Sequence, residues 1–250
     1  MRKRLITLLI FLFPTTLIRP LLFLLGCKLG KGSKIGFSII NSNQIKFGEG
    51  VRIGHLNYIK VNKIRLEDNA YINHLNILKG PFSLHLKRKA AIGKLNIITR
   101  ARIGITYGHS ELSLGNLTKI NSFHFLDLTN SIVIGDHSTL AGIRSQIWTH
   151  GYVHETNDGP NRFRVDGKVI IGNNVYIGSN VFVNPGVQVC DEIHIGGNSN
   201  ISKSLVRPGM YVNQRLRWLE RNSNDIKASL EKNCIDTIIE PVYVKNLDEK

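Results

Sequence analysis

The chain of 250 residues contains few cysteines, and their number and spacing bear on two kinds of structure that depend on cysteine. Its three cysteines, Cys27, Cys190 and Cys234, lie far apart. An odd number of cysteines without close spacing excludes a disulfide framework and a cysteine-ligated zinc site. A reducing compartment is the simplest interpretation, so we expect a cytoplasmic protein.

Acidic residues are missing from one part of the chain. Residues 1–48 hold eight Lys or Arg residues and no Asp or Glu. The whole chain has 33 basic and 18 acidic residues, a formal net charge of +15. This excess favours an anionic partner, such as a phosphate-bearing ligand, a membrane surface or a nucleic acid. No aromatic-basic pattern or binding motif supports nucleic acid, so we expect no nucleic-acid partner.

The sequence also lacks an apolar run near its N-terminus that is long enough to cross a membrane. Residues 5–13, L-I-T-L-L-I-F-L-F, are followed by Pro14, whereas a spanning helix needs about 20 apolar residues. No small-residue cleavage site follows, as a signal peptide would require. Short apolar segments with basic flanks are suited to the membrane interface. We therefore expect residues 1–28 to hold the protein at the inner face of the cytoplasmic membrane. The alternative is an apolar plug over the end of the main domain.

The dominant feature of the sequence is a period of six residues. Steps of six from Ile171 to Ile201 meet only aliphatic residues, each followed by a small or short polar residue. The same period occurs upstream with phase slips. An amphipathic helix repeats at 3.6 and an exposed strand at 2, so neither explains it. A coil of short strands does, with one inward aliphatic residue per strand and a tight corner after it. Strands of a sandwich, the alternative, do not hold a fixed six-residue phase.

Residues 170–187, I-I-G-N-N-V-Y-I-G-S-N-V-F-V-N-P-G-V, resemble the hexapeptide-repeat acyltransferases, and the sugar O-acetyltransferases in particular. The resemblance is strong from about residue 114 to 210 and generic from about 30 to 113. It implies an all-β fold, a left-handed parallel β-helix over residues 29–212, usually a homotrimer that uses acetyl-CoA or a related acyl-CoA. Residues 213–250 lack the period. In that segment R-L-R-W-L-E and A-S-L-E-K predict a short C-terminal helical cap before a tail.

An interruption of the period at residues 150–168 predicts the catalytic loop, because a segment looped out of a solenoid coil commonly carries function. In the family, a Thr-His or Gly-His pair at the start of this loop supplies the catalytic base, and His150 stands at that position. A neutral imidazole can take the proton of an alcohol as it attacks a thioester, and can return one to the CoA thiolate. His154 has a counterpart in some members, but not as the base.

The resemblance also implies an acyl-CoA site and an acceptor site. In the family, CoA lies between two subunits, along the coils after the loop. Tyr176 matches the aromatic residue near the thioester, and Ser179 matches the residue whose backbone N–H is an oxyanion donor. Gly197 matches a contact to the pantetheine arm. Ser202 and Lys203 match a pair near the nucleotide phosphates. For the sugar, Asn121 matches directly and Asp127 matches if one residue is inserted; both types bind hydroxyl groups.

The resemblance therefore implies an enzyme that moves an acetyl group from acetyl-CoA to a hydroxyl of a sugar or lipid-linked sugar, in surface-polysaccharide biosynthesis. An amino-sugar N-acyltransferase remains an alternative, because the same fold and base would serve an amine. A metal-dependent hydratase of the carbonic-anhydrase branch and a non-enzymatic trimeric scaffold are weaker alternatives. The hydratase needs three zinc-binding histidines at set positions, which His150 and His154 resemble only loosely. We therefore expect no metal.

Overall fold

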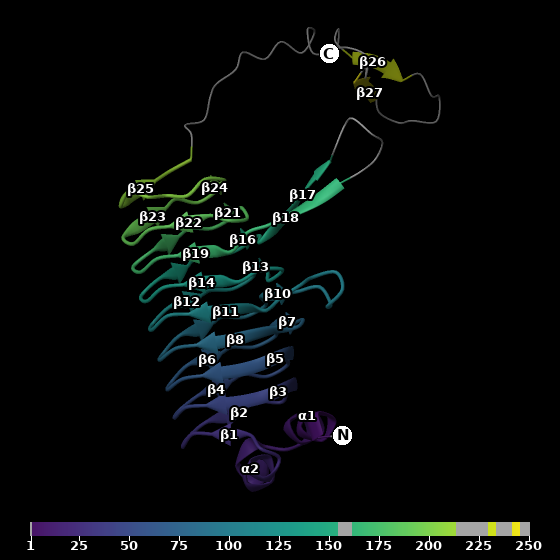
Figure 1. Ribbon diagram of the computed structural model, residues 1–250, viewed down its shortest axis with the longest axis vertical. Helices are drawn as coiled ribbons and strands as arrows, with labels where there is room; N and C mark the ends of the chain where they lie inside the picture. Colours follow the sequence, from purple (N-terminus) through teal and green to yellow (C-terminus); the bar gives the residue numbers. More distant parts are fainter. Residues whose placement is uncertain (1, 155–161, 214–229, 234–241, 246–250) are drawn as a thin grey trace. The chain divides into compact units, whose positions relative to one another are not determined.

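In the computed structural model, residues 2–154, 162–213, 230–233 and 242–245 can be described. The chain divides into two compact units, residues 1–213 and 214–250. The first unit is a solenoid of stacked coils preceded by two helices, α1 (Arg2–Leu12) and α2 (Thr15–Leu24) (Figure 1). Each regular coil has three short strands, so the solenoid has three faces.

The strands of each face pair in parallel with those of the coils above and below. Face one consists of β1 (Lys28–Leu29), the second halves of β3 (Ile39–Phe47) and β5 (Tyr58–Leu66), β8 (Phe82–Leu86), β11 (Ser110–Leu114), β14 (Ile132–Ile134), β19 (Val169–Ile171) and β22 (Gln188–Val189). Face two consists of β2 (Lys34–Ile35), β4 (Arg52–Ile53), β6 (Tyr71–Ile72), β9 (Ala91–Ile92), β12 (Lys119–Ile120), β15 (Thr139–Leu140), β20 (Tyr176–Ile177), β23 (Ile193–Ile195) and β25 (Gly209–Tyr211). Face three consists of the first halves of β3 and β5, β7 (Ile77–Lys79), β10 (Ile97–Thr99), β13 (Phe125–Asp127), β16 (Gln146–Ile147), β21 (Phe182–Val183) and β24 (Asn200–Ile201).

The aliphatic residues of the six-residue period form the core of this solenoid. Every aliphatic residue in the series from Ile171 to Ile201 is buried. Their strands stack directly, as in the parallel pairs Ile134↔Ile171 and Ile177↔Ile195. Each coil therefore buries its aliphatic residues against the next one, which is the property of a repeat solenoid. The prediction of a parallel β-helix is confirmed.

A ladder of buried polar side chains runs up the corner between faces two and three. Asn76 donates from its backbone N and its Nδ2 to Asn57 Oδ1, at 2.9 and 3.0 Å. Asn96 repeats both bonds to Asn76 Oδ1, at 2.9 and 3.1 Å. The next coil continues the ladder, because the backbone N of His124 donates to Asn96 Oδ1 at 2.9 Å. These bonds satisfy backbone groups that the corner takes out of the strand pairing.

Replacing Asn76 by alanine should lower the free energy of unfolding by about 2–4 kcal/mol, because buried donors of Asn96 lose their acceptor. Asn200 is the matched control, since its side chain accepts a bond from Asn184 Nδ2 at an exposed site. Asn200→Ala should cost less than about 0.5 kcal/mol. Denaturant unfolding of the two variants measures the difference, and equal losses would contradict a structural role for the ladder.

The inner faces of the two helices cover the open end of the first coil. Ile6 and Ile10 of α1 and Ile18 and Leu22 of α2 are buried in the same core as the solenoid aliphatics. The Thr15 hydroxyl bonds both backbone groups of Ile35, at 2.8 Å each. The plug that the sequence offered as an alternative is therefore present. Within the described part of the chain, no helix is long and apolar enough to cross a bilayer.

The second unit is described only at β26 (Leu230–Asn233) and β27 (Val242–Lys245), which pair antiparallel. The first helix expected there, R-L-R-W-L-E, lies outside the described residues. The second, A-S-L-E-K, is corrected for its last three residues, which belong to β26. The Val-Tyr-Val segment opposite favours a strand, so pairing prevails over the weak helical preference of so short a segment.

Candidate active site

The catalytic loop expected at residues 150–168 leaves the solenoid at the corner after face three. Its described parts form β17 (His150–His154) and β18 (Arg162–Asp166), an antiparallel pair in which His150 lies opposite Asp166. The coil resumes at Gly167, whose backbone N donates to the Thr149 carbonyl at 2.8 Å. We call this corner the hairpin edge; it also holds Asp127, at the end of β13 one coil below.

His150 and Asp127 meet on the hairpin edge. Nδ1 of His150 lies 2.8 Å from Oδ2 of Asp127. The Asp127 side chain is only 7% exposed, whereas 24% of the His150 side chain is open to solvent. The Thr149 hydroxyl also donates to Asp127 Oδ2, at 2.8 Å, and the Thr129 hydroxyl donates to Oδ1, at 2.9 Å. A buried carboxyl group thus has donors on both of its oxygens.

These bonds determine the ionisation of Asp127 and the tautomer of the His150 imidazole. Burial raises the pKa of Asp127, but hydrogen bonds from His150, Thr149 and Thr129 outweigh it, so the pKa lies below the ordinary 3.8. Asp127 is therefore a carboxylate at neutral pH and can only accept hydrogen bonds. A carboxylate at Nδ1 selects the tautomer of the neutral imidazole in which Nδ1 carries the proton and Nε2 carries the lone pair.

Two aromatic side chains flank the imidazole. Trp148 and Tyr152 present their rings to His150 edge-on, with centroids 5.9 Å away in both cases. Trp148 packs in turn on Phe125, at 4.9 Å. Trp148 and Tyr152 thus hold the His150 ring from two sides, while the Asp127 carboxylate one coil below binds its Nδ1. The sequence interpretation missed Trp148 and Tyr152, although W-T-H-G-Y places an aromatic residue two positions to either side of His150.

Five of the other predicted site residues occupy two corners of the solenoid. Ser202 and Lys203 follow β24 and are exposed on the hairpin edge, two coils beyond His150. Asn121, Ser179 and Gly197 are exposed at the corner between faces two and three, which we call the Ser179 edge.

Within the Ser179 edge, Ser179 and Gly197 lie one coil apart, linked by the bond from Asn198 N to the Ser179 carbonyl, 2.9 Å. Tyr176 lies nearby on face two and stacks on His194 with centroids 4.5 Å apart. A single protomer therefore does not bring these residues to His150.

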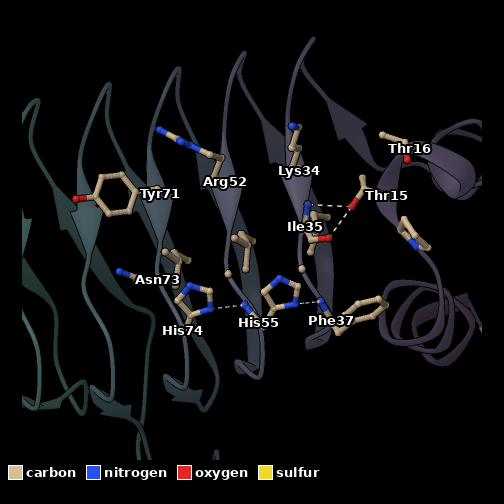
Figure 2. A pocket seen from close by; sticks show the side chains of 15 residues that line it. Thr15, Thr16, Lys34, Ile35, Phe37, Arg52, His55, Tyr71, Asn73 and His74 are labelled. Carbon is tan, nitrogen blue, oxygen red and sulfur yellow. Dashed lines mark hydrogen bonds between the residues drawn. The ribbon is translucent and has the colours of Figure 1, made fainter.

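A pocket lies elsewhere, on the first coils of face two beside the start of α2. It measures about 660 Å³, and Figure 2 shows Lys34, Arg52 and Tyr71 in one row along it. In the second row, His55 N donates to His74 Nδ1 at 2.9 Å, and Phe37 N donates to His55 Nδ1 at 3.2 Å. None of the predicted site residues lines this pocket.

The described histidines offer no metal centre. No group of three or more His, Cys, Asp or Glu side chains in the described ranges is placed to hold a metal ion. His124 belongs to the polar ladder of the core. Burial lowers its pKa to about 4, against opposing backbone hydrogen bonds, so it is neutral at physiological pH.

Comparison with known proteins finds likeness of fold without close relatives. No protein-family model and no curated protein sequence matches the chain. Two solved structures with similar folds are the polySia-specific acetyltransferase NeuO (16% identity, covering 79% of this chain and 84% of that one, TM-score 0.41) and the polysialic acid O-acetyltransferase OatWY (15%, 80% and 91%, 0.39). A third is AntD, an N-acyltransferase from Bacillus cereus in complex with dTDP and 3-hydroxybutyryl-CoA (17%, 83% and 90%, 0.30). At these identities and TM-scores, the likeness assigns no role to any residue of this chain.

Proposed function

We propose that the protein is an acyltransferase that moves an acetyl group from acetyl-CoA to a sugar hydroxyl group, with His150 as general base. The observation that carries the proposal is the bond of His150 Nδ1 to the buried Asp127 carboxylate, which leaves Nε2 as a proton acceptor on an accessible edge. An alcohol is a weak nucleophile at neutral pH and needs such a base. A non-enzymatic scaffold would have no use for a buried carboxylate behind an accessible imidazole.

In this mechanism, His150 Nε2 takes the proton of the acceptor hydroxyl as its oxygen attacks the thioester carbonyl. Asp127 stabilises the imidazolium that forms and keeps the ring in place. When the tetrahedral intermediate collapses, the C–S bond breaks, and the imidazolium returns its proton to the CoA thiolate. No covalent enzyme intermediate is required.

Asp127 thereby takes a role different from the sugar ligand that the sequence resemblance implied. Both of its oxygens accept hydrogen bonds from protein groups, and its side chain is almost completely buried. We propose that it positions His150. Asn121 keeps its proposed contact with the sugar, since its side chain is exposed.

We also propose that a second copy completes the site. The residues expected at acetyl-CoA lie on both the hairpin edge and the Ser179 edge, and neither edge encloses a ligand alone. A symmetric homotrimer would bring the hairpin edge of each protomer against the Ser179 edge of the next. Tyr176, Ser179 and Gly197 would then face His150 across the interface, with Ser202 and Lys203 beside the nucleotide phosphates.

An exposed apolar column supports such an interface. Leu56, Leu75, Leu95 and Phe123 occupy successive coils of the Ser179 edge, and each has φ between 58° and 63°. This left-handed conformation is unfavourable for large residues, and yet they are 36–63% exposed. A contiguous exposed apolar strip of this kind is typical of a surface covered by a partner.

Incubation of the full-length protein with acetyl-CoA and a panel of water-soluble glycans tests the function. We expect an acetylated glycan and free CoA, detected by mass spectrometry, with attack by a hydroxyl oxygen. Products acetylated on amino groups would point to the N-acyltransferase instead. Equal product from His150→Ala would remove the proposed base. The natural acceptor class, a sugar or lipid-linked sugar of surface-polysaccharide assembly at the inner membrane face, rests on the sequence.

Asp127→Asn should lower kcat by roughly 10²-fold, because an amide nitrogen facing Nδ1 favours the tautomer with the proton on Nε2. The matched control is Asp136→Asn. Asp136 accepts bonds from Asn116 at another corner, so kcat should be unchanged in that variant.

The hydrogen bonds of Asp127 also lead to a prediction for the pH dependence of stability, tested with the Asp127→Asn variant. The pKa of Asp127 is lowered in the folded protein, so its contribution to stability is present above its ordinary value of 3.8 and is lost as pH falls through the folded pKa. Below about pH 4, the Tm of the wild type should therefore fall more steeply than that of Asp127→Asn. Parallel Tm curves would contradict the bonding of Asp127 described above.

A further inference from the structure

The outer faces of α1 and α2 are apolar as well as the inner ones. Leu5, Leu8 and Leu12 follow one another on the side of α1 that faces away from the core, and all three are exposed. On α2 the most exposed large apolar residues are Leu17, Phe23 and Leu24, at 73%, 71% and 80%. Together with Phe11, Phe13 and Leu21 they form what we call the end facet. A monomeric soluble protein rarely exposes so many large apolar residues together.

The charges around the end facet are all positive. Arg2, Lys3, Arg4 and Lys28 are exposed beside it, and no acidic residue precedes Glu49. Arg19, which the sequence also suggested as a headgroup contact, is used inside the protein: its guanidinium donates to the carbonyls of Leu29 and Gly30, at 2.8 and 2.5 Å. Arg2 Nε also donates to a backbone carbonyl, that of Leu25, at 2.7 Å, although the residue stays exposed. The charge available to an anionic partner therefore comes mainly from Lys3, Arg4 and Lys28.

We propose that the end facet binds the surface of a bilayer containing anionic lipids, so that the solenoid stands on its N-terminal end. Apolar side chains with a basic rim are the features of an interfacial amphipathic helix. A second copy is a weaker occupant, because a symmetric end-to-end dimer would bring two basic rims together with no acidic partner. The helices would lie on the membrane without crossing it, with their inner faces still closing the first coil.

This orientation sets the distance from the membrane to the candidate active site. The helices stack on the first coil, through bonds of Thr7 and Thr15 to Ile40 and Ile35 (Figure 1). His150 follows β16, which lies five steps above β3 on face three, in the order β3, β5, β7, β10, β13, β16. Five steps of about 4.8 Å and one helix layer of about 10 Å place His150 roughly 35 Å from the lipid surface.

This distance limits how short the acceptor can be, a step that rests on the proposed function. A sugar attached directly to a membrane lipid would lie at the headgroups and could not reach His150. The acceptor class is therefore a lipid-linked oligosaccharide, long enough to present a hydroxyl group several sugars away from its lipid. The edges of the solenoid rise from the membrane along the direction in which such a chain would extend.

Vesicle flotation tests the docking step without any need for activity. The wild type should float with phosphatidylcholine–phosphatidylglycerol vesicles and remain behind with phosphatidylcholine alone. Leu17→Ser, Phe23→Ser and Leu24→Ser combined should weaken binding by about tenfold or more. The matched control combines Val206→Ser, Met210→Ser and Val212→Ser, three exposed residues far along the chain from the helices, and should bind as the wild type does. Thermal melting verifies that both variants are folded.

Three outcomes would overturn the docking proposal: no binding of the wild type to anionic vesicles, undiminished binding of the helix variant, or loss of a lipid-free oligomer in that variant, which would assign the end facet to a second copy. Acetylation of water-soluble glycans is measured in parallel and tests the proposed function alone.

The distance from the membrane to His150 is tested with synthetic lipid-linked acceptors. Acceptors of one sugar and of eight or more sugars are compared in the same vesicles. Only the longer ones should be acetylated, and equal acetylation of the single sugar would refute the upright orientation.

Discussion

His150→Ala is expected to lower acyl transfer by at least about 10²-fold, the contribution of a general base, while the fold and the oligomeric state stay unchanged. The imidazole lies at the edge of the solenoid and belongs to no part of the aliphatic core. Its removal leaves Asp127 with its bonds from Thr149 and Thr129. The loss should therefore fall on kcat, measured as CoA release with saturating acetyl-CoA and a soluble glycan.

His154→Ala is the control for this experiment, because it removes a second histidine four residues along the same strand. We expect it to retain most of the wild-type rate. The reverse ranking of the two variants would mean that His154 is the base. A wild-type rate in His150→Ala would remove the imidazole from the mechanism and leave the His150–Asp127 bond as a structural contact.

The fold could be predicted from the sequence because its cause is local. Each inward aliphatic residue and the small residue after it recur within six positions, so the period is visible without knowing which coils are neighbours. The ladder of buried asparagine side chains at the corner between faces two and three could not be predicted in the same way. Asn57, Asn76 and Asn96 look like ordinary turn residues, and only their vertical stacking shows that they are buried and bonded to one another.

The pairing of His150 with Asp127 shows where sequence patterns stop being informative. Regular coils advance 18 residues, as from Tyr176 to His194, but the step from Phe125 to Gln146 is 21. Such insertions decide which side chains lie above one another, and spacing along the chain does not reveal them. The N-terminal segment is a similar case, since apolar residues on all sides of two helices fit a plug and a membrane contact equally well. The structure divides these residues between an inner and an outer face.

The division of the site between two edges leads to the second prediction with a large effect, the recovery of activity from two inactive variants. His150→Ala removes the base from the hairpin edge. Ser179→Trp places a bulky side chain at an exposed position of the Ser179 edge, where the acyl-CoA is proposed to lie. Each variant alone should be nearly inactive. In a trimer mixed at random from equal amounts, about a quarter of the interfaces would combine an intact His150 with an intact Ser179 from the neighbouring subunit.

Co-expression of the two variants with different affinity tags, followed by purification through both tags, isolates the mixed oligomers. Every mixed trimer has one intact interface out of three, so the rate per subunit should approach about a third of the wild-type rate. The same variants purified separately and assayed together without subunit exchange should remain inactive. If His150 and Ser179 instead act within one protomer, every subunit of a mixed oligomer carries a defect and no activity returns. Absence of activity in correctly assembled mixed oligomers would therefore refute the shared site, and with it the assignment of acetyl-CoA to an interface between the two edges.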